Sequence, residues 1–120
     1  MTSSEDIVRI YHNPRCSKSR ATLALLRERG IEPDVIEYLK TPPSREELAR
    51  ILDLLGLEPR DLMRRNEEAY KAADLDDPGL TRETLILAMI QRPQLIQRPI
   101  VIANGKASIG RPPEQVLEIL

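Results

Sequence analysis

The 120-residue sequence predicts a single α/β domain over residues 1–120, with a mixed sheet of about four strands. Three observations predict this fold class. Near the N-terminus, a strand-like segment, a helical segment and a second strand-like segment follow one another. Helical patterns then occupy about residues 44–92, and a β-hairpin followed by a helix ends the sequence. The expected order is therefore β-α-β, an inserted helical region, and β-β-α.

The first strand–helix–strand unit occupies the N-terminal third. Residues 7–11 are β-branched and apolar apart from one arginine, and Pro14 ends this strand because proline cannot donate to a ladder. Residues 17–29 favour a helix, with Gly30 as a natural stop. Its apolar face is expected to comprise Ala21, Leu23, Ala24, Leu25 and Leu26. Residues 34–39 return to a strand, which predicts a parallel pair joined by a right-handed crossover.

The inserted region opens with a well-marked helix over residues 44–56. Ser44 and Glu47 form a capping box at its start. Its apolar residues repeat at helical spacing, namely Leu48, Ile51, Leu52 and Leu55. Residues 58–75 predict shorter helical pieces, and a further helix runs over residues 81–93.

The C-terminal part carries a clear hairpin. Strands over residues 99–103 and 106–109 flank Asn104 and Gly105, which suit a type I′ turn because both central positions need positive φ. Residues 111–120 are predicted to form a final helix. Without the inserted region, this element order is that of a thioredoxin-like fold.

The composition excludes several classes of protein. The formal net charge is −1, with 18 basic and 19 acidic residues, so neither nucleic acid nor an anionic membrane surface is expected as a partner. No apolar stretch approaches the roughly 20 residues that cross a bilayer. A single cysteine cannot form an internal disulfide and favours a reducing, cytoplasmic location. One cysteine and one histidine also offer too few soft ligands for a metal site.

The only cysteine and the only histidine lie four residues apart, at Cys16 and His12. If Cys16 lies where the first strand ends and the helix begins, unpaired first-turn N–H groups and the helix dipole lower its pKa. The same donors can hold an oxyanion. Arg20 lies one helical turn further on the same face and could stabilise the thiolate or a bound anion, as could His12 if protonated. Ser19 stands where a C-x-x-C motif would have its second cysteine, so an external thiol would have to resolve any mixed intermediate.

The alternative is that these residues are structural. A lone cysteine is more often a small buried hydrophobe than a nucleophile, and a lone histidine is more often a satisfied structural residue. The Asn-Pro break, the polar Ser-Lys-Ser run and Arg20 together favour a functional Cys16. Two further arginines, Arg98 and Arg111, flank the hairpin at strand ends where sites usually form, although most such arginines are simply solvated.

The segment YHNPRCSKSR resembles the signature H-x3-C-x3-R of the glutaredoxin-linked arsenate reductase (ArsC) family. The resemblance extends over essentially the whole chain, through YLKTPPSREEL, LMRRN and RPIVIANGKASIGRPPEQVLEIL. The loop SKSR and the end at Leu120 are similar to a short chromosomal branch of the family. The resemblance implies a thioredoxin-like fold with an inserted helical region.

The resemblance also implies an activity, the reduction of arsenate to arsenite in arsenic detoxification. Cys16 would attack arsenate covalently, with glutathione as co-substrate, no bound cofactor, and glutaredoxin as the partner that recycles the enzyme. His12 would help to lower the thiol pKa, and Pro99 would form a cis peptide bond beside the thiol. Three arginines would bind the oxyanion: Arg64, Arg98 and Arg111.

Two other functions remain open at this stage. One is a glutathione- and glutaredoxin-coupled thiol transferase that acts on another substrate. The other is a non-enzymatic binding module similar to transcription regulators of this fold, although Ser19 removes the C-x-x-C switch that such regulators use. A monomer is expected in each case.

Overall fold

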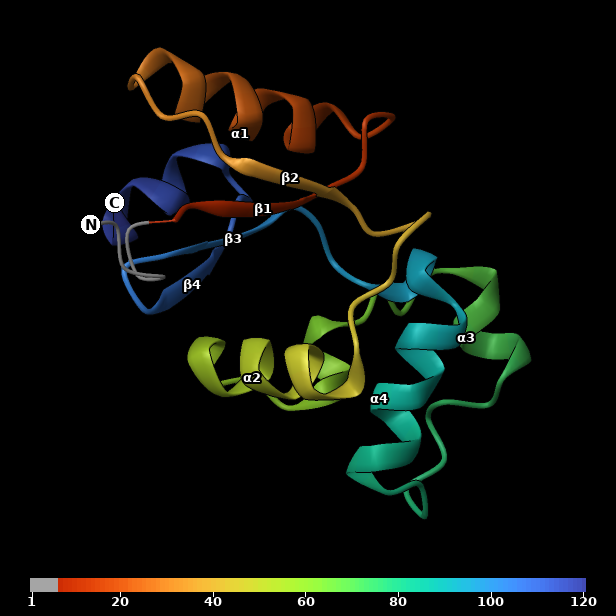
Figure 1. Cartoon of the computed structure of the whole chain (residues 1–120). Coiled ribbons are helices and arrows are strands. Elements are labelled where there is room, and N and C mark those ends of the chain that lie inside the picture. Colours follow the sequence, from red (N-terminus) through yellow and green to blue (C-terminus); the bar gives the residue numbers. More distant parts are fainter. Residues whose placement is uncertain (1–6) are drawn as a thin grey trace. The chain divides into compact units, whose positions relative to one another are not determined.

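The computed structural model describes residues 7–120 and contains two compact units (Figure 1). The first unit comprises the chain up to Thr41 together with Arg98–Leu120, and the second is Pro42–Gln97. The inserted region expected at about residues 44–92 lies entirely within the second unit. The first unit holds the sheet.

Four strands form this sheet: β1 (Arg9–His12), β2 (Asp34–Glu37), β3 (Ile100–Ala103) and β4 (Lys106–Ile109). Their order is β2-β1-β3-β4. Strand β1 is parallel to β2 and antiparallel to β3, and β3 pairs with β4 in an antiparallel hairpin. The predicted mixed sheet in an α/β, thioredoxin-like order is therefore confirmed.

Two helices pack against this sheet, α1 (Ser17–Glu28) and η4 (Pro113–Ile119). Fully buried side chains from two strands and both helices form the core between them, namely Ile10, Leu26, Val101 and Val116. Burying such aliphatic side chains is the main favourable term for this unit. The final helix was predicted in the right place, but it is a 3₁₀-helix, whose first turn closes through a 3.0 Å bond from Gln115 N–H to Pro112 C=O.

The buried face of α1 differs from the expected apolar face. Ser19, Thr22 and Leu26 are the buried residues, whereas Ala21 and Ala24 are exposed, so that part of the prediction was wrong. The two hydroxyl groups tolerate burial because each is hydrogen bonded. The Thr22 hydroxyl, for example, donates to the Lys18 carbonyl of its own helix at 2.8 Å.

The hairpin turn matches its prediction. Asn104 and Gly105 have φ values of 54° and 71°, as a type I′ turn requires. The Asn104 side-chain amide also donates to the Ile119 carbonyl at 2.8 Å, which ties the turn to η4.

The second unit is helical, with α2 (Arg45–Leu55), α3 (Glu68–Ala72) and α4 (Arg82–Gln91). Two short 3₁₀-helices accompany them, η2 (Pro59–Leu62) and η3 (Pro93–Leu95). The Ser44 hydroxyl caps α2 by accepting from the Glu47 N–H at 3.1 Å, as predicted. Helix α4 packs on α2, η2 and η3. Buried apolar side chains of this unit include Leu48, Ile51, Leu52, Leu62, Leu85, Met89 and Leu95.

In the part of the chain that the structure describes, no helix combines the length and the apolar character needed to span a bilayer.

Gly110 is buried where β4 leaves the sheet, and its lack of a side chain allows a close approach. A Cβ atom there would collide with Thr22 Oγ1 and would lie 2.8 Å from Pro99 Cγ. The Thr22 hydroxyl is held by Lys18, and a proline ring is stiff, so neither neighbour can move aside easily. Gly110 therefore lets α1, the start of β3 and the end of β4 meet.

We expect Gly110→Ala to destabilise the protein by about 1–3 kcal/mol through overpacking. Gly79→Ala is the control, because its Cβ would meet only the exposed Asp77 carboxylate at 3.3 Å and should cost less than about 0.5 kcal/mol. Urea unfolding followed by far-UV circular dichroism measures both. Equal stability of the two variants would contradict the close approach at Gly110.

Candidate active site

Cys16 lies at the N-terminus of α1, as the sequence predicted. Its backbone is extended, with φ −92° and ψ 122°, and its carbonyl accepts the first helical bond from Arg20 N–H at 3.0 Å. The Asn13 side chain accepts from Arg15 N–H at 3.0 Å, and the Asn13 carbonyl accepts from Cys16 N–H at 3.0 Å. This Asx turn with its proline ends β1 and directs the chain into the helix. The thiol therefore stands at the helix entrance.

The surroundings of the sulfur favour the thiolate. Cys16 is partly exposed. Burial raises its pKa, but the Ser19 N–H, the Arg98 side chain and the Lys18 N–H donate hydrogen bonds to the sulfur. The net effect is that the pKa of Cys16 lies below its usual value. Ser19 and Lys18 belong to the first turn of α1, whose N–H groups have no partners within the helix. A reactive thiolate is the expected consequence.

Arg98 reaches the thiol because of the strand pairing. In the sheet, Ile100 of β3 lies opposite Tyr11 of β1, so the residues before β3 lie beside the loop after β1. The Arg98–Pro99 peptide bond is cis, which is the geometry that the resemblance predicted. Arg98 Nε is buried and has no hydrogen-bond partner among residues 7–120. Besides its hydrogen bond to the thiol, the guanidinium therefore has Nε–H available as a donor to an anion.

Arg111 lies next to Arg98. Its Nη1 donates to the Arg98 carbonyl at 3.0 Å, and both side chains are partly buried. The next carbonyl, that of Pro99, accepts from Gly110 N–H at 2.9 Å. The Arg111–Pro112 peptide bond is also cis, which the sequence did not indicate. Two of the three predicted anion-binding arginines therefore lie side by side in the first unit.

His12 is buried at the end of β1 and contacts Ser19. Its Nδ1 lies 2.6 Å from Ser19 Oγ, and the same oxygen accepts from Asn13 N–H at 3.0 Å. In a neutral imidazole, the Ser19 hydroxyl donates to Nδ1 if Nδ1 is unprotonated and accepts from it if Nδ1 carries the proton. Ser19, considered from the sequence only as a missing cysteine, is fully buried and ties His12 to the loop before Cys16.

The charge state of His12 differs from the protonated form considered from the sequence. Burial lowers its pKa, Glu37 raises it, and Arg27 and Arg20 lower it, with a net shift below the usual value. Burial of the ring and the two nearby guanidinium groups disfavour a positive charge on His12. His12 is therefore neutral near pH 7 and acts through hydrogen bonding.

The structure gives Arg20 and Arg64 partners within their own units. Arg20 is exposed, and its Nη1 donates to the Pro14 carbonyl at 2.9 Å, so it braces the loop. Arg64 belongs to the second unit, where its Nη1 forms a 2.6 Å ion pair with Glu67. Its part in oxyanion binding stays a prediction of the family resemblance.

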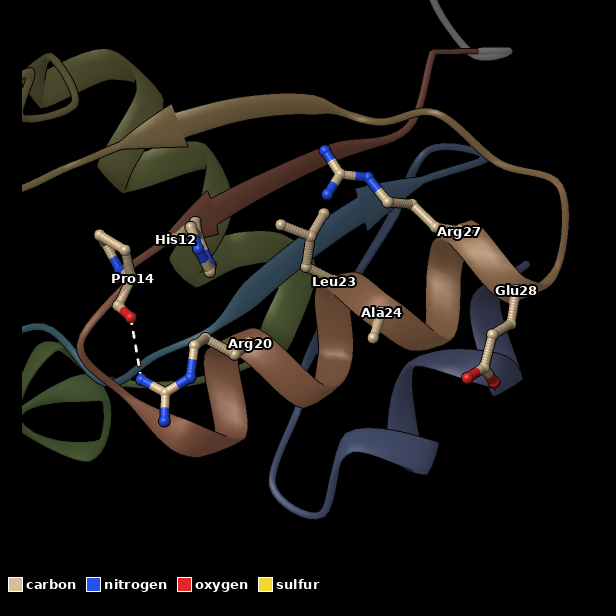
Figure 2. A pocket seen from close by; sticks show the side chains of 7 residues that line it. All are labelled: His12, Pro14, Arg20, Leu23, Ala24, Arg27 and Glu28. Carbon is tan, nitrogen blue, oxygen red and sulfur yellow. Dashed lines mark hydrogen bonds between the residues drawn. The ribbon is translucent and has the colours of Figure 1, made fainter.

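A shallow groove of about 650 Å³ runs along α1 and reaches the end of β1 at His12 (Figure 2). Arg20, Leu23 and Arg27 line it from the helix, with His12 and Pro14 at one end. Figure 2 shows Arg20 reaching the Pro14 oxygen and Arg27 projecting further along the helix. Neither Cys16 nor Arg98 lines this groove, so it does not include the thiol. Within residues 7–120, no cluster of three or more His, Cys, Asp or Glu side chains could hold a metal ion.

Comparison with known proteins covers nearly the whole chain. A profile of the ArsC family matches residues 11–119. YfgD, an uncharacterised protein of Escherichia coli K12, is 58% identical over 94% of this chain and 96% of its own length. A protein of Neisseria meningitidis named arsenate reductase is 50% identical over 94% of this chain and 97% of its own length. A solved structure named arsenate reductase, from Vibrio cholerae, is 58% identical, covers 98% of this chain and 100% of that one, and superposes with a TM-score of 0.93.

The lowered thiol pKa predicts alkylation at unusually low pH. We expect the iodoacetamide reaction rate of Cys16 to reach half its plateau below the pH of an ordinary cysteine, because the reacting species is the thiolate. Arg98→Gln should raise this midpoint by about one unit, since a hydrogen bond to a charged group contributes about 1.5 kcal/mol or more. Lys106→Gln removes an exposed charge in the hairpin and serves as the control. An unchanged midpoint in Arg98→Gln would refute the contact between Arg98 and the thiolate.

Proposed function

The chain belongs to the ArsC family, and we propose that it reduces arsenate to arsenite with Cys16 as the nucleophile. The observation that carries this proposal is the thiol at the entrance of α1, which receives hydrogen bonds from the Ser19 N–H and from Arg98. A thiolate is needed to attack the arsenic atom, and donors already in place are needed for the arsenate oxygens. The site around Cys16 supplies both the thiolate and the hydrogen-bond donors.

In the first step, the Cys16 thiolate attacks the arsenic atom of arsenate and forms an S–As bond. One arsenate oxygen leaves as water after taking up a proton, and arsenic remains in the +5 state. Arg98 favours this step because its guanidinium neutralises the oxyanion and its buried Nε has a donor to offer. Arginine suits such a ligand because its planar fork matches adjacent oxygens.

In the second step, an external thiol reduces the arsenic atom. The sulfur of glutathione bonds to the Cys16 sulfur, the S–As bond breaks, and its electron pair stays on arsenic. Arsenic is thereby reduced from +5 to +3 and leaves as arsenite, while the two sulfurs are oxidised to a mixed disulfide. An external thiol is required because Cys16 is the only cysteine and Ser19 occupies the position of a resolving one.

In the third step, a glutaredoxin thiolate attacks the glutathione sulfur of the mixed disulfide. The Cys16 thiolate is then the leaving group. Its lowered pKa assists this step, because a more acidic thiol leaves faster. The same hydrogen bonds from α1 and Arg98 thus serve the first and the last step.

The direct test is arsenate reduction by the wild-type protein with glutathione and glutaredoxin, followed as NADPH consumption through glutathione reductase. We expect Cys16→Ser to lose at least about a thousandfold in kcat/KM, because a hydroxyl group does not ionise near pH 7. Lys106→Gln should keep wild-type activity, and omission of either reductant should stop turnover. Full activity of the serine variant would sink the proposal.

A thiol transferase acting on glutathione mixed disulfides is the second candidate. The observation that favours it is the single acidic thiol, since monothiol exchange needs no second cysteine. Turnover of arsenate and of a glutathionylated peptide should therefore be compared under identical reductants. A peptide kcat/KM well above that for arsenate would favour the transferase.

A further inference from the structure

The Arg111 guanidinium is bonded to the backbone of the residue whose side chain contacts the thiol. Its Nη1 lies 3.0 Å from the Arg98 carbonyl oxygen, and its own N–H donates to the Ile109 carbonyl at 2.9 Å. Both ends of Arg111 are therefore held within the first unit. A hydrogen bond from a charged donor to a carbonyl is one of the stronger kinds in proteins.

The carbonyls of Arg98 and Pro99, which belong to successive peptide bonds, are both held by the segment after β4. Arg111 binds the first carbonyl and Gly110 N–H binds the second, at 2.9 Å. These bonds define the orientation of two successive peptide planes. The Arg98 Cα lies in the first of these planes, so the bond from Arg111 restrains the point from which the Arg98 side chain starts.

We propose that Arg111 is a positioning residue, which holds the Arg98 guanidinium at the Cys16 sulfur through its bond to the Arg98 carbonyl. The effect of Arg111 on arsenate turnover rests on the proposed function. Its effect on Arg98 and on the thiol is present in the protein without any substrate. This role differs from direct oxyanion binding, which the family resemblance implies for Arg111. One donor of the five on its guanidinium is used for the carbonyl, so the two roles are compatible.

The two roles are distinguishable because only positioning changes the acidity of the Cys16 thiol when no oxyanion is bound. If Arg111 positions Arg98, its loss weakens a contact to the thiolate in the free protein, and the thiol becomes less acidic. If Arg111 only binds arsenate, its loss raises KM for arsenate and leaves the free thiol unchanged. Removal of the charge of Arg111 could also act on the thiolate directly through space, and a double-mutant cycle separates that effect.

The test is a pH titration of Cys16 in the absence of arsenate, by thiolate absorbance and by alkylation rate. Arg111→Met removes the donor and keeps an apolar stem, and we expect it to raise the midpoint by about half a unit, which is a threefold lower thiolate fraction at low pH. Arg111→Lys, which can still donate to the carbonyl, should restore part of the shift. In the Arg98→Met background, Arg111→Met should have no further effect.

Three results would overturn the proposal: an unchanged midpoint in Arg111→Met with a native circular dichroism spectrum, an equal shift in both backgrounds, or an Arg111→Lys midpoint that matches Arg111→Met. If Arg111→Met does not fold, Arg111→Leu, which also removes the donor, takes its place: a raised midpoint supports positioning, and an unchanged midpoint refutes it. The titration needs no substrate. A failure to reduce arsenate would therefore count against the proposed function and leave this test intact.

Discussion

The site depends on one interaction, the stabilisation of an anionic sulfur by donors that the fold holds in place. Cys16 lies at the start of α1, where the N–H groups of Lys18 and Ser19 have no helical partners, and Arg98 adds a full positive charge. These contacts outweigh the cost of partial burial, which alone would favour the neutral thiol. Because the donors are already oriented, little reorganisation is needed when charge moves from sulfur to a bound oxyanion.

The pairing of β1 with β3 brings the Cys16 sulfur and the Arg98 guanidinium together. Strand β1 ends at His12 and leads into Cys16, and β3 begins just after Arg98. The antiparallel register of these strands places the two ends side by side. The β3–β4 hairpin then returns the chain to the same edge of the sheet, where Gly110 and Arg111 bind the backbone of the Arg98 segment. Any shift of this register would separate the guanidinium from the sulfur.

Hydroxyl side chains show where sequence reasoning fell short. The apolar residues of α1 suggested a buried face that includes Ala21 and Ala24, yet both are exposed. The face that packs inward carries Ser19 and Thr22, whose hydroxyls are satisfied by His12, Asn13 and Lys18. Serine and threonine patterns carry no sign of this, because burial of a hydroxyl depends on partners supplied by other segments. For the same reason the neutral state of His12, which follows from burial beside two guanidiniums, was not apparent.

Local signals in the sequence were sufficient for the elements themselves. The turn at Asn104 and Gly105, the cap at Ser44, the stop at Gly30 and the position of Cys16 at a helix start all depend on neighbouring residues, and all occur as predicted. Only the tertiary structure decided which charged groups reach the sulfur. Arg20, close in sequence, turns to the Pro14 carbonyl, whereas Arg98, distant in sequence, contacts the thiol. The physical reason is that helix and turn propensities act over a few residues, while the position of a guanidinium in space is determined by strand pairing between segments far apart in the chain.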